Sequence, residues 1–216
     1  MKKLLLAIVF ISTFFTFTAC KKTNPYENKI SQLRTDVYVC EAENYTITAY
    51  PEIRENPFLS DGKVGKLEKV MIFKLNFLND ETKTDLYKIE FDIDGKTYSS
   101  QFEYKPSSTF LYCQVLVENL PQKSFNVTLK DDNHSFSNQL NSVKKSNTLD
   151  YVKILKSFKD NEKTSALMNE DNEIKIRLIN NGDYDYYYVG FSSEEKTVSY
   201  LLDGFTGEII AQKDDA

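Results

Sequence analysis

The sequence predicts a mainly β protein, in which an antiparallel, immunoglobulin-like β-sandwich is followed by a small α+β unit, a helix with a three-stranded meander. Two patterns lead to this prediction. Residues 36–145 contain seven short runs in which apolar and polar side chains alternate, a period typical of strands. After them, apolar side chains recur at three-residue steps, as on one face of a helix, and three more alternating runs follow.

Composition favours packed cores and excludes several classes of protein. Of the 216 residues, 41% are hydrophobic and 27% are charged, with 14 Tyr and 15 Phe, whereas disordered chains lack such apolar content. With 7 Gly and 5 Pro, the chain is unlike collagen, a low-complexity chain or a nucleotide fold built on a Gly-rich loop. Without residues 1–19, 25 basic residues face 32 acidic ones, a formal net charge of −7. Because its lysines are scattered among acidic residues, we expect no nucleic-acid partner.

Residues 1–19 are typical of an export signal. Lys2 and Lys3 precede an uncharged run of 14 residues, 4–17, and small side chains then lead to Cys20. A helix needs about 20 apolar residues to span a bilayer, so the run of 14 residues is shorter than a transmembrane helix requires. The alternative is a buried N-terminal helix, although no polar face interrupts the run. We expect the rest of the chain to be exported.

Residues 17–20, Phe-Thr-Ala-Cys, resemble the lipobox of bacterial lipoproteins, whose usual pattern is Leu, a small or apolar residue, Gly or Ala, then Cys. Phe17 is the single departure. The resemblance implies diacylglyceryl transfer to the Cys20 thiol, cleavage before this residue, and anchoring to the extracytoplasmic face of the cell membrane. Two or three acyl chains on one residue make such an anchor effectively permanent. The alternative is cleavage near Ala19 and release of a soluble protein.

Residues 20–35 are polar and lack strong periodicity, which predicts a tether between the lipid and the folded part. The sandwich follows in residues 36–145. Asp94-Gly95, between two alternating runs, predicts a tight hairpin. The seven runs that predict strands are 37–40, 45–50, 70–78, 86–93, 97–104, 110–117 and 125–129.

Residues 51–69 interrupt the alternation with Pro51, Pro57, two glycines and several charges, and we expect a long loop. Phe58 would be an exposed apolar tip if the loop is open. Two interpretations stay open. Phe58 either contacts a partner or plugs the end of the sandwich.

Cys40 and Cys113 lie in alternating runs, on the oxidising side of the membrane if the chain is exported. They either form a disulfide or lie buried separately as small apolar side chains. Their spacing, with a single His134, matches no zinc pattern, and the acidic residues near His134 lack the alternation of a calcium loop. We expect no metal and no cofactor.

Residues 146–216 form the predicted α+β unit. Asn147 or Thr148 is suited to cap the helix, and Asn181-Gly182 predicts a tight turn after the first strand of the meander. The apolar face of the helix consists of Leu149, Val152, Leu155 and Phe158. The three alternating runs of the meander are 173–179, 183–191 and 197–203.

Residues 202–209, Leu-Asp-Gly-Phe-Thr-Gly-Glu-Ile, resemble the closing strand and turn of PepSY domains. The preceding helix and meander are similar in order and length to those of that family, so the likeness covers about 65 residues, 148–213. The resemblance implies interaction with, or restraint of, peptidases or envelope proteins. Gly207 suits a positive φ and Asp203 can accept backbone N–H bonds, so we expect Asp203, Thr206 and Gly207 to form a structural turn and not a catalytic site.

A tyrosine-rich run forms part of the predicted meander. In a strand, Tyr184, Tyr186 and Tyr188 share one face and Tyr187 lies on the other. A single helix covers one face, so the other face is exposed or meets a partner. Tyrosine offers a large contact area at low entropic cost, so these tyrosines, with Phe58, are the predicted binding surface. The alternative is a sheet that is covered on one side and half-exposed on the other.

Two classes of function remain. The first is a non-catalytic binding or accessory module, anchored through Cys20, whose partner is another envelope protein or a peptide. The second is an envelope-acting hydrolase that uses a carboxylate pair such as Glu194 with Glu195, or Asp131 with Asp132. We favour binding, because neighbouring carboxylates in a sequence usually form a solvated surface.

Overall fold

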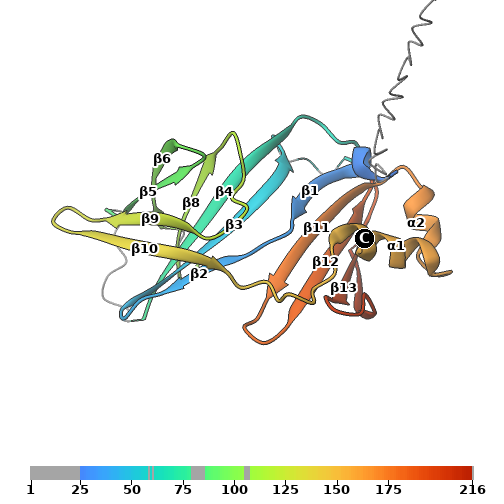
Figure 1. Cartoon of the computed structure of the whole chain (residues 1–216). Coiled ribbons are helices and arrows are strands. Elements are labelled where there is room, and N and C mark those ends of the chain that lie inside the picture. The colour runs from blue at the N-terminus through green and yellow to red at the C-terminus, as the bar shows by residue number, and fades with distance from the viewer. Residues whose placement is uncertain (1–24, 58, 60, 79–85, 105–107, 216) are drawn as a thin grey trace, which may run out of the picture.

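The computed structural model describes residues 25–57, 59, 61–78, 86–104 and 108–215. Residues 1–19, Cys20 and Phe58 therefore lie outside the described residues. The described part of the chain is mainly β, with two α-helices (Figure 1). None of its helices is both long and apolar enough to cross a bilayer.

The strands of the described residues form one mixed sheet in the order β14-β13-β12-β11-β1-β3-β2-β10-β9-β5-β6. Off this path, β4 pairs with β3, β8 pairs with β4, and β7 pairs with β8. Each of the seven alternating runs contains a strand. The elements are η1 Glu27–Lys29, β1 Ile30–Arg34, β2 Tyr38–Glu41, β3 Tyr45–Glu55, β4 Leu67–Phe77, β5 Lys88–Ile93, β6 Lys96–Gln101, β7 Glu103–Tyr104, β8 Leu111–Leu116, β9 Phe125–Lys130, β10 Ser135–Ser142, α1 Tyr151–Asp160, α2 Ser165–Asn169, β11 Glu173–Asn180, β12 Asp185–Ser192, β13 Thr197–Asp203 and β14 Ile209–Asp215.

Two layers of strands enclose the first core. Strands β5, β6, β9 and β10 lie over β2, β3, β4 and β8, and β10 pairs with both β9 and β2, so it links the layers (Figure 1). The predicted hairpin joins β5 to β6, with Asp94 and Gly95 both at positive φ. The first core includes Tyr38, Ile47, Phe73, Leu75, Phe91, Leu111, Val127 and Leu129.

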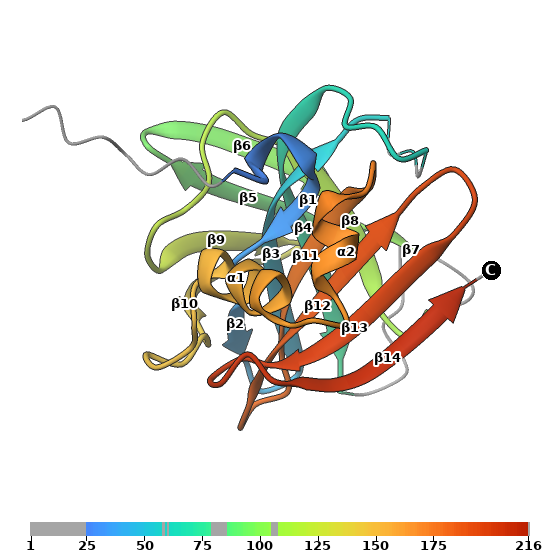
Figure 2. The ribbon, with the colours of Figure 1, turned by 90° about the vertical axis from the view of Figure 1, so that its right-hand side faces the viewer.

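Helices α1 and α2 cover one face of β11, β12 and β13 and enclose the second core (Figure 2). Helix α1 begins after Asp150, whose side chain accepts a hydrogen bond from Lys153 N, so the prediction of Asn147 or Thr148 as the cap is wrong. The second core includes Ile154, Leu155, Phe158, Ile174, Ile176, Leu178, Tyr187, Val189, Phe191 and Leu202.

The predicted tether is too long, because its last part is a strand. Strand β1 pairs in parallel with β11 and antiparallel with β3, and it joins the two units in one sheet that is mixed and not purely antiparallel. Ser31 and Gln32 are polar but buried, with exposed fractions of 0% and 4%. The alternation that marks the other strands is therefore missing here.

Two more boundaries differ from the prediction. Strand β3 continues to Glu55, and Pro51 lies opposite Met71 on β4, so the loop after β3 spans residues 56–66 and not 51–69. The meander has a fourth strand, β14, which pairs with β13. Strands β10 and β14 escaped prediction because their side chains are mostly polar and exposed.

Candidate functional site

One face of the sheet, from β8 across β4, β3 and β1 to β11 and β12, carries polar and aromatic side chains. These side chains share one face because side chains alternate along a strand, and every second residue of these strands points away from the two cores. The strand register brings these residues together, because Arg34 lies opposite Arg177 and Gln32 lies opposite Arg54. We call this surface the polar sheet face, which consists of Gln32, Arg34, Tyr50, Glu52, Arg54, Lys74, Tyr112, Gln114, Arg177 and Tyr188.

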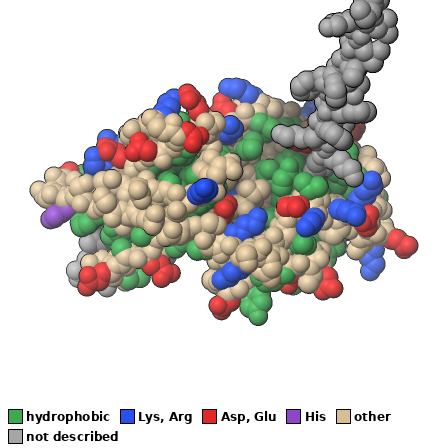
Figure 3. Space-filling view, viewed as in Figure 1, with side chains coloured by type: hydrophobic (Ala, Val, Ile, Leu, Met, Phe, Trp, Pro, Cys, Tyr) green, Lys and Arg blue, Asp and Glu red, His purple; other side chains and the backbone are tan. Residues whose placement is uncertain are grey.

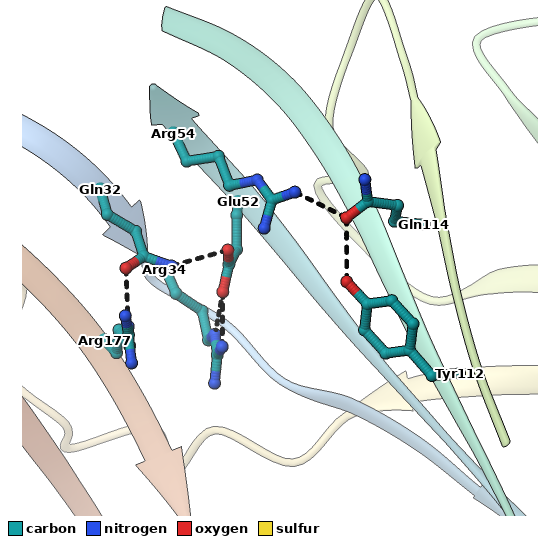
Figure 4. A network of polar contacts seen from close by, with 7 residues as sticks. All are labelled: Gln32, Arg34, Glu52, Arg54, Tyr112, Gln114 and Arg177. Atoms are coloured by element: carbon teal, nitrogen blue, oxygen red, sulfur yellow. Dashed lines mark hydrogen bonds and ion pairs between the residues drawn. The ribbon is translucent and has the colours of Figure 1, made fainter. Parts of the chain in front are cut away.

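Glu52 is the centre of the polar sheet face (Figure 4). Its carboxylate is fully buried, and it accepts hydrogen bonds from Arg34 Nε at 2.8 Å and Gln32 Nε2 at 2.8 Å, with a further contact to Arg34 Nη2. A buried carboxylate is tolerated when a cation and hydrogen-bond donors compensate its lost hydration. The charge-assisted bonds therefore fix Arg34 and Glu52 in one geometry.

Gln32 extends this network to the second unit. Its Oε1 accepts a hydrogen bond from Arg177 Nε at 2.7 Å, so Arg177, Gln32, Glu52 and Arg34 form a chain across β11, β1 and β3 (Figure 4). On the other side, Gln114 Oε1 accepts hydrogen bonds from Arg54 Nη2 at 2.6 Å and from the Tyr112 hydroxyl at 2.9 Å. Hydrogen bonds within the fold thus hold these side chains in place.

Aromatic rings lie beside the cations of this face. The Arg34 guanidinium lies 4.2 Å from the centroid of the Tyr50 ring, and the Lys74 ammonium lies 4.5 Å from that of Phe110. The Arg177 guanidinium lies 5.3 Å from the centroid of the Tyr188 ring. Such cation–π contacts hold a charged group while leaving other edges free to meet a ligand.

The centre of the polar sheet face has more positive than negative charge. Four cations, on Arg34, Arg54, Lys74 and Arg177, surround the one carboxylate of Glu52. Burial, together with the nearby Arg34 charge, lowers the pKa of both Lys74 and Arg177. Glu68, opposite Arg54 on β4, already binds Lys66 Nζ at 2.6 Å and Asn56. The surplus of positive charge at the centre of the polar sheet face contrasts with the negative net charge of the whole chain. In Figure 3, acidic and basic side chains are interspersed over the visible face.

Sequence reasoning missed this network. Arg34 fell in the predicted tether, and Glu52 and Arg54 fell in the predicted loop. A usable signal was present, because Tyr50, Glu52 and Arg54 continue the period of two that begins at Tyr45. Pro51 concealed it, although a proline in a strand is tolerated where its missing N–H is not needed.

The predicted tyrosines divide between the two faces of β12. Tyr184, Tyr186 and Tyr188 lie on the side away from the helices, and Tyr184 is 53% exposed, with its ring 6.4 Å from that of Tyr186. Tyr187 is fully buried in the second core, and its hydroxyl donates to Leu149 O at 2.9 Å. Burial raises the Tyr187 pKa. Tyr187 is therefore not part of the predicted binding surface.

Asp203, Thr206 and Gly207 form a turn between β13 and β14. Asp203 Oδ1 accepts hydrogen bonds from the backbone N–H groups of Phe205 at 2.7 Å and Thr206 at 2.8 Å, and these bonds lower the pKa of its carboxyl. Gly207 has φ of 76° and donates its N–H to Asp203 O. The roles of these residues are structural.

Cys40 and Cys113 are both free, so the predicted disulfide is absent from the fold. Cys40 on β2 lies opposite Ile47 on β3, and Cys113 on β8 lies opposite Phe73 on β4. Three strand spacings of about 4.8 Å separate the two cysteines, or about 14 Å, whereas a disulfide needs Cα atoms within about 7 Å. Burial raises the pKa of the Cys113 thiol to about 12, so this thiol is protonated at neutral pH.

The carboxylates of the alternative hydrolase lie in two separate places. Glu194 and Glu195, with Asp61 and Asp171, line an open cavity of about 660 Å³ beside the loop after β3, and all four are exposed. Asp131 accepts hydrogen bonds from two backbone N–H groups of the β9–β10 turn, which lower its pKa. Among the described residues, no group of three or more His, Cys, Asp and Glu side chains is placed to hold a metal ion.

No family model, curated protein or solved structure matches this chain.

Proposed function

We propose that this protein is an exported, lipid-anchored binding module. In this proposal residues 1–19 are removed, Cys20 carries the lipid, and the folded part lies at the extracytoplasmic face of the cell membrane. It binds another envelope protein or a peptide and catalyses no reaction. The observation that carries the binding role is the polar sheet face, with its fixed arginines and adjoining tyrosines.

The proposal includes two fold assignments. Two layers of strands around the first core support an immunoglobulin-like sandwich. Helices on one face of an antiparallel meander, with the turn at Asp203, support a PepSY-like unit for residues 146–216. The PepSY likeness adds a specific role, restraint of a peptidase in the envelope.

Arginine and tyrosine are the residues expected at a binding surface. Both are enriched in protein interfaces and among the residues that contribute most to binding energy. On the polar sheet face they are held by the Glu52 network, which lowers the entropy lost on binding. The alternative hydrolase would need two buried carboxylates that converge in a cleft, whereas Glu194 and Glu195 are exposed at the lining of an open cavity and Asp131 is used in a turn.

Charge reversal tests the binding role in intact cells. The double variant Arg54→Glu/Lys74→Glu should lose the cross-linked partner that the unchanged protein captures, because both side chains point away from the cores. Lys123→Glu, at an exposed turn between β8 and β9, is the matched control and should retain the partner. Recovery of the same partner with the folded double variant would remove the polar sheet face from consideration.

Mass spectrometry of the mature N-terminal peptide tests the anchor. We expect a diacylglyceryl group on Cys20 and none in Cys20→Ser, which should remain uncleaved or leave the membrane fraction. An unmodified mature N-terminus in the unchanged protein would overturn the anchoring part of the proposal.

A further inference from the structure

We infer that the outer side of α1, with the adjoining residues Pro25 and Tyr26, is a docking surface for the anionic headgroups of the membrane that holds the lipid anchor. This inference rests on the proposed function, because docking requires the lipid on Cys20. Its consequence is an orientation in which α1 faces the bilayer and the polar sheet face points away from it.

Chain length places this end of the molecule near the membrane. The described chain begins at Pro25, five residues after Cys20. Because an extended chain spans at most about 3.6 Å per residue, Pro25 lies within about 18 Å of the lipid-bearing residue. The start of the described chain, η1, lies at the same end of the molecule as α1 and α2 (Figure 1).

The first described residues are held against the helices. Tyr26 packs on the second core, and Lys29 Nζ donates to Glu170 O at 2.7 Å and to Met168 O at 3.3 Å, next to α2. Pro25 and Tyr26 also line an apolar hollow of about 240 Å³ with Val152 and Leu155 of α1. The anchored end of the chain therefore cannot swing away from α1 without breaking these contacts.

Helix α1 presents a basic outer side. Its apolar side is buried in the second core, whereas Lys153, Lys156 and Lys159 are exposed and Val152 is 44% exposed. Lys156 and Lys159 also border the apolar hollow, and Asp160 is the one acidic residue among its lining. Within α1 itself, three lysines and one aspartate leave a surplus of two positive charges, which Asp150 and Glu27 beside Tyr151 partly offset. Lysines next to an apolar surface combine headgroup attraction with insertion of aliphatic groups.

The sequence places further lysines beside the lipid. Lys21 and Lys22 directly follow Cys20, in a mature chain whose net charge is negative. Lysines are attracted to anionic lipid within a Debye length, about 8 Å at physiological salt, so the attraction acts only on the side that touches the bilayer. The anchor keeps α1 at high effective concentration near that surface, so a modest attraction suffices to orient the protein.

The two faces of β11 explain the resulting orientation. Ile176 points toward α1, whereas Arg177, the next residue, points to the polar sheet face. With α1 on the bilayer, the polar sheet face is turned toward the envelope space, where a partner approaches.

Lysine footprinting on vesicles tests the inference. The full mature lipidated protein is reconstituted into vesicles of phosphatidylglycerol with phosphatidylcholine, or of phosphatidylcholine alone, and treated with an amine-acylating reagent. On the anionic vesicles, acylation of Lys153, Lys156 and Lys159 should fall by about threefold or more, because headgroup contact shields them. Acylation of Lys123, on the turn between β8 and β9, should not change. Equal acylation of the α1 lysines on both vesicles would overturn the inference.

A charge-reversed protein sharpens the test. Lys156→Glu/Lys159→Glu should lose the protection of Lys153 on anionic vesicles, while Lys88→Glu/Lys123→Glu should keep it. Retained protection in the first variant would contradict an electrostatic contact. The acylated protein is digested with a protease to locate the modified lysines, and the same digests report the mass of the Cys20 peptide. A missing lipid overturns the proposed function and the inference with it, whereas a lipidated protein without protection overturns the inference alone.

Discussion

Strands β11 and β12 have one face in the second core and one face on the polar sheet face. Residues of the two faces alternate along the sequence. Tyr187 is fully buried against α1 and satisfies its hydroxyl on Leu149 O. Tyr188, its neighbour, lies half-buried beside the Arg177 guanidinium. The same type of side chain thus packs in the core at one position and lies on the polar sheet face at the next. Position relative to the helices decides its role.

Tyr187→Ala should have the largest effect, because it leaves a cavity in the second core and removes the hydrogen bond to Leu149 O. We expect a loss of about 3–5 kcal/mol in the free energy of unfolding, measured by urea denaturation. Tyr188→Ala is the matched control and should cost about 1 kcal/mol or less, mainly its contact with Arg177. Similar losses for both variants would contradict the assignment of the two faces.

Glu52→Gln should have the next largest effect, because it removes the charge that compensates Arg34. We expect a loss of about 2–3 kcal/mol in unfolding free energy, below the cost of breaking a fully buried pair, because the Arg34 side chain is 17% exposed. Glu68→Gln, whose partner Lys66 is largely in solvent, should cost clearly less. If the two changes cost the same, the polar sheet face is not organised around Glu52.

Asp203→Asn should have a smaller effect that depends on pH. The folded pKa of Asp203 is lowered, so its contribution to stability is present above the unfolded value of about 3.9 and is lost as pH falls through the folded pKa. The variant should therefore melt at a lower temperature than the unchanged protein at pH 7, and the gap should narrow in acid. Thermal melts from pH 7 to pH 2 measure this. A gap independent of pH would show that the carboxylate charge does not matter to the turn.

Tyr184→Ala should have the smallest effect on stability. Tyr184 is 53% exposed, and its ring centroid lies 6.4 Å from that of Tyr186 and 6.2 Å from that of Phe205. We therefore expect the free energy of unfolding to change by no more than about 0.5 kcal/mol. Recovery of a cross-linked partner is the informative measurement. Weaker recovery would extend the proposed binding surface beyond Tyr188 to the β11–β12 turn, and unchanged recovery would confine it to the arginine network.

The parts of the fold that sequence predicts are those in which burial alternates strictly. Strands such as β5 and β9 have an apolar residue at every second position because one side faces a core. The helix was recognisable because its apolar residues recur on the one side that faces the second core. Its cap was missed because Thr148 uses its hydroxyl on Asp185, which leaves Asp150 to cap the helix.

The candidate site was harder to predict, because long-range pairing creates it. Arg34 and Arg177 are neighbours only through the parallel pairing of β1 with β11. Gln32 and Glu52 are buried polar residues that form a hydrogen bond with each other. From the sequence alone, residues of these types are expected at the surface. Tyr184, Tyr186 and Tyr188 were placed on one face correctly, because that inference needs only the local period of a strand.

Strand β1 has a consequence for the order in which the protein folds. It is the first strand of the described residues to be synthesised, yet it lies between β3 and β11, and its Gln32 bonds to Arg177, 145 residues later. Until β11 has been made, β1 can pair with β3 only, and the other edge of β1 stays unpaired. A contact so distant along the chain forms slowly, because a long loop must close first. Strand β11, within residues 173–180, therefore governs when β1 becomes fully paired, and a chain truncated before it would leave an aggregation-prone edge in the middle of the sheet.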